Sequence, residues 1–177
     1  MSRLIRNPIM FGENVKIAFD KNVLTISGVN GESKINIPHF INLAVSDNSV
    51  QILPKDDVSK ADYPMLGTMR SLIKSAILGV NTKFVETLDL FGTGYKAAVV
   101  EGRLEMQLGY SHPIILDIPS ELTVVCPKPN VVEISGIDKQ QVGQFVVHVQ
   151  SKRKPRPYKG GEIRRKGQFI RKKAGKR

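Results

Sequence analysis

Two stretches of the sequence indicate how the chain folds: 15–28, VKIAFDKNVLTISG, and 95–108, YKAAVVEGRLEMQL. At an offset of 80 residues, similar residues meet in the same order: Lys16 and Lys96, Leu24 and Leu104, Ile26 and Met106. When the offset grows by one residue, Ile37 matches Ile118. When it grows by one residue more, Val50 matches Val132 and Ile52 matches Ile134. Matches that keep their order through most of both halves predict an internal duplication.

Within each half, short runs of alternating apolar and polar residues indicate strands. Turn residues such as Asn30-Gly31 and Glu101-Gly102 separate these runs. The expected strands lie around 15–19, 23–26, 35–37, 43–45 and 50–52 in the first half, and around 95–100, 104–108, 114–118, 122–125 and 131–134 in the second. Segments of this length and pattern are typical of half-buried antiparallel sheet.

One amphipathic helix is expected near the end of each half. In the first half, Asp62 precedes apolar residues at helical spacing: Met69, Ile73, Ile77 and Val80. In the second half, Asp138 precedes a second apolar stripe: Val142, Phe145, Val146 and Val149. Asp138 and Gln141 also have the spacing of a capping box, which marks the start of this helix.

These patterns predict an α+β fold with two homologous modules, each a small, mainly antiparallel sheet packed against one helix. We assign residues 1–82 to the N-terminal module, 83–151 to the C-terminal module and 152–177 to a basic extension, with the link between the modules near 81–87. A module of about 70 to 80 residues is large enough to fold with a modest margin of stability.

The positive charge of the chain is concentrated at its C-terminus. The chain of 177 residues has a formal charge of +11, but residues 152–177 hold thirteen Lys/Arg and one acid, Glu162, which leaves +12 there and −1 elsewhere. Like charges repel, so we expect this segment to need a polyanion before it orders, and such a block is typical of a nucleic-acid contact. The composition excludes a disordered polyelectrolyte, and the longest apolar run, 97–100, is too short for a membrane span.

Few residues indicate chemistry. The three histidines, His39, His112 and His148, fall in different predicted elements, and we expect His148 to be partly buried beside the stripe of its helix. The single cysteine, Cys126, excludes an internal disulfide framework and has no neighbour that would activate its thiol. Gly92-Thr93-Gly94 precedes a strand pattern rather than a helix, which indicates a tight bend and not a dinucleotide site. No catalytic residue, metal or cofactor is therefore expected.

Four motifs resemble one known family. Phe91-Gly92-Thr93-Gly94-Tyr95-Lys96-Ala97, Leu108-Gly109-Tyr110-Ser111-His112-Pro113 and, on the first helix, Gly67-Thr68-Met69-Arg70 are similar to motifs of a bacterial-type large-subunit ribosomal protein family, the L-six family. The segment from Pro155 to Ile163 resembles that family's Pro-acid-Pro-Tyr-Lys-Gly-Lys-Gly-Ile signature. It departs at Arg156, where an acid is usual, and at Gly161-Glu162, where Lys-Gly is usual.

The resemblance implies a structural, non-enzymatic protein of the large ribosomal subunit. It would bind large-subunit ribosomal RNA near the factor-binding region and the base of the stalk. Its partners would be that RNA and neighbouring large-subunit proteins, with translation factors nearby and no membrane. It would lie on the ribosome in the cytoplasm, or alternatively in an organelle matrix with bacterial-type ribosomes.

The expected RNA-binding residues all lie in the extension. They are the basic residues and the tyrosine of 152–177: Lys152, Arg153, Lys154, Arg156, Tyr158, Lys159, Arg164, Arg165, Lys166, Arg171, Lys172, Lys173, Lys176 and Arg177. Pro155 and Pro157 favour an extended backbone in this segment. Tyr158 either stacks on RNA or packs back onto the second module.

Two other hypotheses for the basic extension belong to different functional classes. In the first, the chain is an RNA-modifying or hydrolytic enzyme that uses the extension to capture its substrate, although no cluster of catalytic side chains is recognisable. In the second, the chain is a peripheral membrane protein, but the extension lacks the apolar face or lipidation signal that stable anchoring needs.

Overall fold

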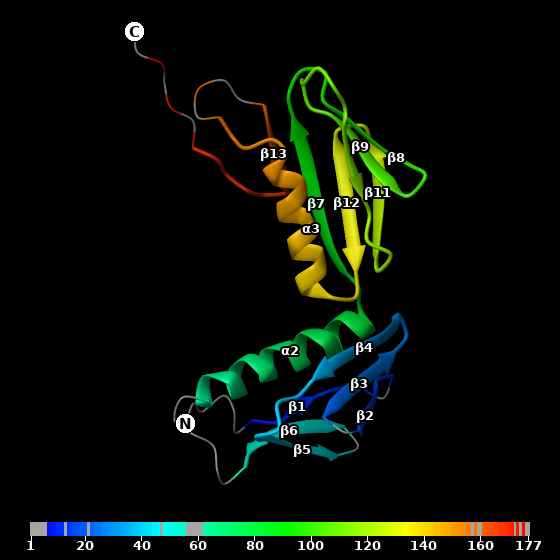
Figure 1. Cartoon of the computed structure of the whole chain (residues 1–177), viewed down its shortest axis with the longest axis vertical. Coiled ribbons are helices and arrows are strands. Elements are labelled where there is room, and N and C mark those ends of the chain that lie inside the picture. Colours follow the sequence, from blue (N-terminus) through cyan, green and yellow to red (C-terminus); the bar gives the residue numbers. More distant parts are fainter. Residues whose placement is uncertain are drawn as a thin grey trace. The chain divides into compact units, whose positions relative to one another are not determined.

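The computed structural model describes residues 7–12, 14–20, 22–46, 48–55, 62–156, 158, 161–171, 173 and 175. The chain divides into two compact units, Met1–Lys83 (unit 1) and Phe84–Arg177 (unit 2). Among the described residues, each unit combines two small antiparallel sheets with one helix, as Figure 1 shows. The expected α+β class is confirmed.

Unit 1 contains two three-stranded sheets. One has the order β2-β3-β4, built from β2 (Lys16–Asp20), β3 (Val23–Gly28) and β4 (Gly31–Asn36). The other has the order β1-β6-β5, built from β1 (Ile9–Met10), β6 (Ser49–Pro54) and β5 (Ile41–Ser46). Helix α2 (Tyr63–Asn81) packs on the strands with the apolar stripe expected from the sequence.

Unit 2 repeats this arrangement and adds one strand. A three-stranded sheet, β10-β9-β8, contains β8 (Lys96–Val100), β9 (Arg103–Gln107) and β10 (Ile114–Asp117). A four-stranded sheet, β11-β12-β7-β13, contains β7 (Phe84–Phe91), β11 (Leu122–Lys128), β12 (Val131–Gly136) and β13 (Glu162–Arg165). Helix α3 (Lys139–Ser151) contacts β7, β12 and β13.

The residues matched between the two halves occupy equivalent places. Leu24 and Leu104 are both fully buried on the central strands β3 and β9. Val50 and Val132 are likewise both fully buried, on β6 and β12. The sheets correspond strand by strand, since β1 pairs with β6 as β7 pairs with β12. Only β13 has no counterpart among the strands of unit 1 that the structure describes.

Strand β7 corrects the sequence analysis, which placed the link between modules at 81–87. Helix α2 ends at Asn81 and β7 already begins at Phe84. Leu88 and Leu90 point into the core from this strand, with 0% and 4% of their surface exposed. The comparison of the two halves did not predict β7 because its counterpart, β1, has only two residues.

Both helices begin at the expected aspartates. Asp62 and Asp138 occupy the N-cap positions of α2 and α3. The Asp138 side chain accepts a hydrogen bond of 2.8 Å from the backbone N–H of Gln140, and not from that of Gln141 as the capping-box spacing had suggested. Either bond satisfies an N–H that the first turn of a helix leaves unpaired.

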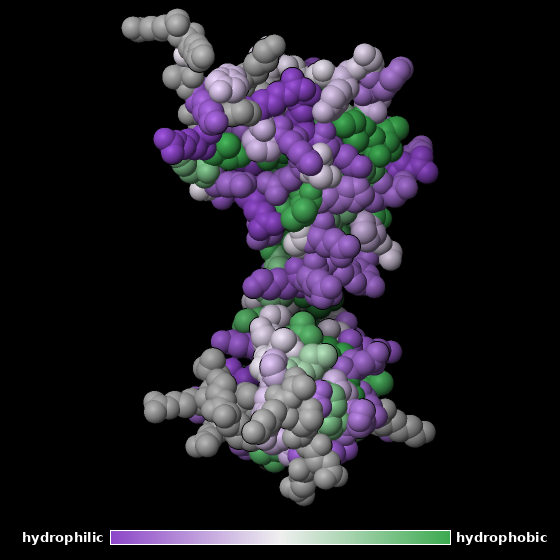
Figure 2. All heavy atoms as spheres, turned by 60° about the vertical axis from the view of Figure 1, so that its left-hand side comes forward, coloured by the Kyte–Doolittle hydropathy of each residue, from purple (hydrophilic) through white to green (hydrophobic). Residues whose placement is uncertain are grey.

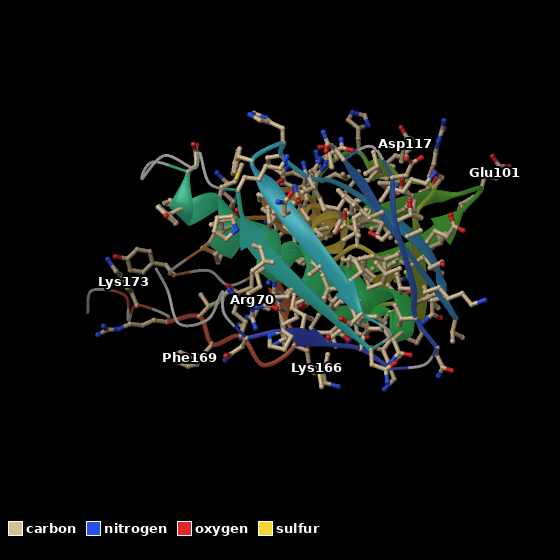
Figure 3. All side chains as sticks on the ribbon, turned by 90° about the horizontal axis from the view of Figure 1, so that it is seen from below. Arg70, Glu101, Asp117, Lys166, Phe169 and Lys173 are labelled. Atoms are coloured by element: carbon tan, nitrogen blue, oxygen red, sulfur yellow. The ribbon has the colours of Figure 1, made fainter. Side chains whose placement is uncertain are left out.

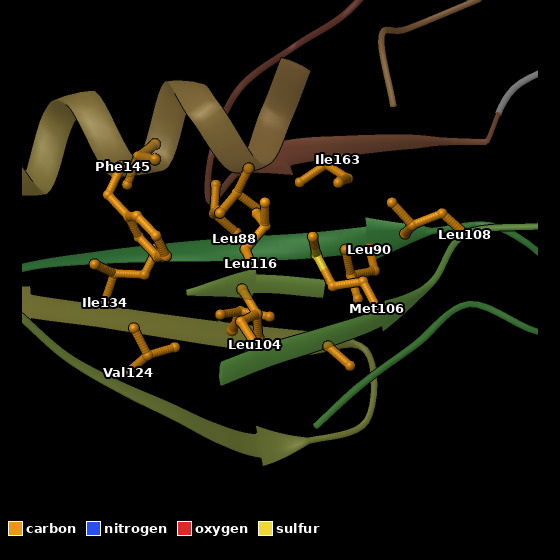
Figure 4. Packing of buried hydrophobic residues seen from close by; sticks show 14 of the residues in the cluster. Leu88, Leu90, Leu104, Met106, Leu108, Leu116, Val124, Ile134, Phe145 and Ile163 are labelled. Carbon is orange, nitrogen blue, oxygen red and sulfur yellow. The ribbon is translucent and has the colours of Figure 1, made fainter. Parts of the chain in front are cut away.

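The core of unit 2 lies between α3 and the two sheets. Helix α3 contributes Phe145 and Val146, while β7 and β9 contribute leucines such as Leu88 and Leu104. Ile163 of β13 joins the same core with 2% of its surface exposed, and Figure 4 shows it beside Leu90, next to α3. The core of unit 2 is therefore completed by a residue from the basic C-terminal extension.

This participation corrects the expectation that the extension orders only on a polyanion. Residues 162–165 pair in antiparallel register with β7, with Ile163 opposite Leu90. The Gln150 side chain of α3 donates a hydrogen bond of 3.4 Å to the Ile163 carbonyl. The Ile163 side chain, the pairing with β7 and the Gln150 hydrogen bond hold this strand on unit 2 despite its charge.

Candidate nucleic-acid interface

The extension leaves α3 over two tyrosines. The Tyr110 hydroxyl donates a hydrogen bond of 3.2 Å to the Lys152 carbonyl at the end of the helix. The next guanidinium, that of Arg153, lies over the Tyr110 ring at 4.7 Å and over the Tyr95 ring at 5.9 Å from the ring centres. A hydrogen bond with Tyr110 raises the pKa of Arg153 further above its ordinary value. Arg153 therefore stays a cation and fixes the start of the extension by cation–π contacts.

Tyr95 is enclosed by glycines from three segments. A Cβ atom at Gly92 would lie 2.6 Å from carbons of the Tyr95 ring, and one at Gly161 would lie 2.8 Å from its hydroxyl oxygen. A Cβ atom at Gly109 would lie 3.4 Å from the same ring, at ordinary contact distance. Only glycine permits such close approach of the backbone. The bend expected at Gly92-Thr93-Gly94 is thus also a surface against which the Tyr95 ring packs.

The segment between Arg153 and Gly161, of which the structure describes 154–156 and 158, begins and ends at Tyr95, and we call it the loop. Arg153, where the chain leaves α3, and Gly161, where it enters β13, both contact Tyr95. The loop carries Lys154 and Arg156, both exposed, and Tyr158, which is 65% exposed. Of the two alternatives for Tyr158, stacking on RNA is the one that an exposed ring allows, because the face of the ring is open to a base. A loop with fixed ends loses less conformational entropy on binding than a free chain.

The charged residues of strand β13 differ in their exposure and in their contacts. Glu162 is buried, with 1% of its surface exposed, and forms an ion pair with Arg164. The Arg164 guanidinium also lies over the Phe91 ring, 4.4 Å from its centre. Arg165 is half-buried, and its backbone N–H donates to the Gln168 side chain at 3.2 Å. Arg164 is thus held by both a carboxylate and an aromatic ring.

The other cations of the extension are open to solvent. Lys166, Arg171 and Lys173 are exposed, whereas Lys152 is half-buried at the end of α3. Figure 3 shows Lys166 and Lys173 pointing outward from the ribbon, and hydrophilic residues cover most of the surface of unit 2 in Figure 2. Four expected RNA-binding residues lie outside the described residues: Lys159, Lys172, Lys176 and Arg177. The described exposed cations flank β13 on both sides along the chain.

The structure adds three aromatic residues that the sequence analysis did not select. Phe169 is 87% exposed between Lys166 and Arg171 and points outward in Figure 3. An exposed aromatic ring among cations is suited to stacking on an unpaired base. An aromatic residue flanked by basic ones was the available signal for Phe169. Tyr95 and Tyr110, in contrast, are brought to Arg153 only by the fold.

No catalytic arrangement is found among the described residues. His39, His112 and His148 are all exposed, so the expectation that His148 is partly buried is wrong. His148 lies beside the apolar stripe of α3 but on its solvent side. Within the same described part, no three His, Cys, Asp or Glu side chains gather as metal ligands. Burial raises the pKa of the Cys126 thiol, which disfavours the reactive thiolate.

Neither α2 nor α3 is long and apolar enough to cross a bilayer, and this holds for every helix in the part of the chain that the structure describes.

Comparison with known proteins agrees with the duplicated architecture. The family model described as ribosomal protein L6 matches residues 11–83 and again residues 91–165. The chain belongs to the ribosomal protein L6 family. The first match covers β2 to α2 and the second covers β8 to β13, while β1 and all of β7 except Phe91 lie outside them. The duplication expected from the sequence is therefore confirmed.

Curated members of the L6 family are similar along the whole chain. A large ribosomal subunit protein uL6 from Hydrogenobaculum sp. is 41% identical over 176 residues, which are 99% of this chain and 96% of that protein. Another, from Gluconacetobacter diazotrophicus, is 37% identical over 177 residues, which are 100% and 99% of the two chains. Membership in a family of ribosomal proteins also confirms that the chain is not an enzyme, and the alternative of an RNA-modifying or hydrolytic enzyme is set aside.

Proposed function

We propose that the chain is a structural constituent of the large ribosomal subunit and binds large-subunit ribosomal RNA through its C-terminal extension. The observation that carries the proposal is the set of exposed cations held on unit 2 by β13 and by the loop closed on Tyr95. The site would lie near the factor-binding region and the base of the stalk, with neighbouring large-subunit proteins around it and translation factors close by. The place of action would be the ribosome in the cytoplasm.

The physical basis of binding would be electrostatic, with RNA shape providing the selection. Phosphate contacts release counterions, so six to ten of them would lower the affinity by roughly 10³ to 10⁵ between low and moderate salt. These contacts carry little sequence information. Exposed Tyr158 and Phe169 would add stacking on unpaired bases, which is less sensitive to salt.

The loop provides the first test. Substituting Lys154→Gln and Arg156→Gln together removes two exposed charges that make no described contact within the protein. We expect weaker binding to protein-free large-subunit ribosomal RNA and a salt dependence, log Kobs against log[salt], reduced by about 1.5. The matched control is Lys16→Gln with Lys34→Gln, which removes the same charge from exposed positions of unit 1. Equal effects of the two double variants would contradict the proposal.

Incorporation into ribosomes provides the second test. Deleting residues 152–177 would also remove Ile163 from the core, so the deletion should cover only 170–177, which keeps β13 and Gln168. We expect this shortened chain to dissociate from large subunits in a high-salt sucrose gradient that retains the full chain. Crosslinking in cells, followed by identification of the attached RNA fragment, tests the location. Attachment only to RNA far from the factor-binding region would refute that part.

A further inference from the structure

The basic extension contains one acid, and the fold buries it. Glu162 is the only Asp or Glu among residues 152–177, and its surface is 1% exposed. In the described part of the chain, the Glu162 carboxylate is contacted by Arg164, whose Nε and Nη2 atoms donate to its Oε1 atom. The other carboxylate oxygen, Oε2, is buried without a hydrogen-bond partner among the described residues. Among the described residues, Arg164 alone therefore compensates the charge of Glu162.

The geometry of β13 favours this pair. Side chains two residues apart on a strand lie on the same face, so Glu162 and Arg164 are neighbours on the face opposite to Ile163. Phe91 pairs with Glu162 across the two strands, and its ring lies under the Arg164 guanidinium. The Arg164 side chain is 19% exposed, between an aromatic ring and a carboxylate.

We infer that Glu162 makes Arg164 a structural cation that does not bind phosphate. An RNA phosphate could attract Arg164 only by leaving the buried Glu162 carboxylate unpaired, and an unpaired buried charge is strongly unfavourable. The same carboxylate also repels a phosphate that approaches this face of β13. This inference rests on the proposed function. It separates Arg164, which is held within unit 2, from the exposed cations of the extension, which face RNA.

The inference is tested by the salt dependence of RNA binding. Arg164→Gln alone would leave Glu162 unpaired and endanger folding, so the test variant is Glu162→Gln with Arg164→Gln. This double variant keeps two hydrogen-bonding side chains and the net charge of the chain. Its control is Lys166→Gln, an exposed cation two residues further on. The probe is protein-free large-subunit ribosomal RNA, titrated over a range of salt concentrations.

We expect the double variant to have the salt dependence of the unmodified chain, while Lys166→Gln reduces it by about 0.7 to 0.9. A reduction of that size in the double variant would overturn the inference, because it would show that Arg164 occupies a phosphate. If the unmodified chain itself shows no salt-dependent binding, the proposed function fails, and this outcome is distinct from the first.

A measurement on the unmodified chain keeps the inference falsifiable if the double variant does not fold. Phenylglyoxal modifies accessible arginines, and mass spectrometry reports the extent at each one. We expect Arg156 to react in the free protein and to be protected by RNA, and Arg164 to be slow in both states. Fast reaction of Arg164 in the free protein, or protection of Arg164 by RNA, would overturn the inference.

Discussion

Tyr95 shows how much one residue contributes to the place where the extension begins. Its ring packs on Gly92 and Gly109, lies beneath Arg153 and leaves room only for a glycine at position 161. The glycines at 92 and 94 were predictable as a bend because a strand pattern follows them. Gly161 was not predictable as part of the same cluster, since it lies 66 residues after Tyr95 and only the pairing of β13 with β7 brings it there.

Gly161 should tolerate no side chain. Its φ angle is +77°, and an added Cβ would lie 2.8 Å from the Tyr95 hydroxyl oxygen. We expect Gly161→Ala to lower the free energy of unfolding by about 1 to 3 kcal/mol in urea denaturation. Tyr95→Phe should recover part of this loss by removing the clash, but not the backbone strain. Gly12→Ala is the control, because its Cβ would meet nothing within 4 Å. Equal stability of the two alanine variants would contradict this account.

At the scale of elements, the duplication was predictable and β13 was not. The matched residues Leu24 and Leu104 are buried on equivalent strands, so the hydrophobic pattern that revealed the repeat also forms both cores. Glu162–Arg165 contains one apolar residue among charged ones and has no alternating pattern to recognise. Its identity as a strand comes from the free edge of β7, which local sequence does not encode.

The contribution of Ile163 to the docking of β13 can be measured as a change in the free energy of unfolding. Truncation of a fully buried isoleucine removes apolar contacts and leaves a cavity, at about 2 to 5 kcal/mol. We therefore expect Ile163→Ala to lower the free energy of unfolding of unit 2 by an amount in this range. The control is Ile115→Ala on β10, where half of the side chain is already exposed. The account fails if both variants unfold at the same denaturant concentration.

At the scale of the molecule, each unit has its own fold, and the positive charge is distributed unequally between the two units. Unit 1 has ten Lys/Arg and seven Asp/Glu, a net charge of +3, whereas unit 2 has seventeen and nine, a net charge of +8. The location of the surplus was predictable from the sequence. Which cations face outward was not, because the burial of Arg164 and the stacking of Arg153 depend on Glu162, Phe91 and the two tyrosines.

Unit 2 should bind RNA without unit 1. All residues of its core come from positions 84 and beyond, and all basic residues of the extension belong to it. We expect residues 84–177, produced alone, to show cooperative thermal unfolding and a salt dependence of RNA binding equal to that of the full chain. Residues 1–83 should bind the same RNA weakly. A large loss of salt dependence in the isolated unit 2 would assign part of the phosphate contacts to unit 1.

The pairing of β7 with β13 also has a consequence for synthesis. Among the described strands of unit 2, β7 is the first and β13 the last, and the sheet β11-β12-β7-β13 pairs the two. The N-terminus of a growing polypeptide leaves the ribosome first, so the outer edge of β7 stays unpaired until residues 162–165 have been made. Unpaired strand edges promote association with other chains. Co-translational folding of unit 2 is therefore completed only after residues 162–165 have left the ribosome that makes the chain.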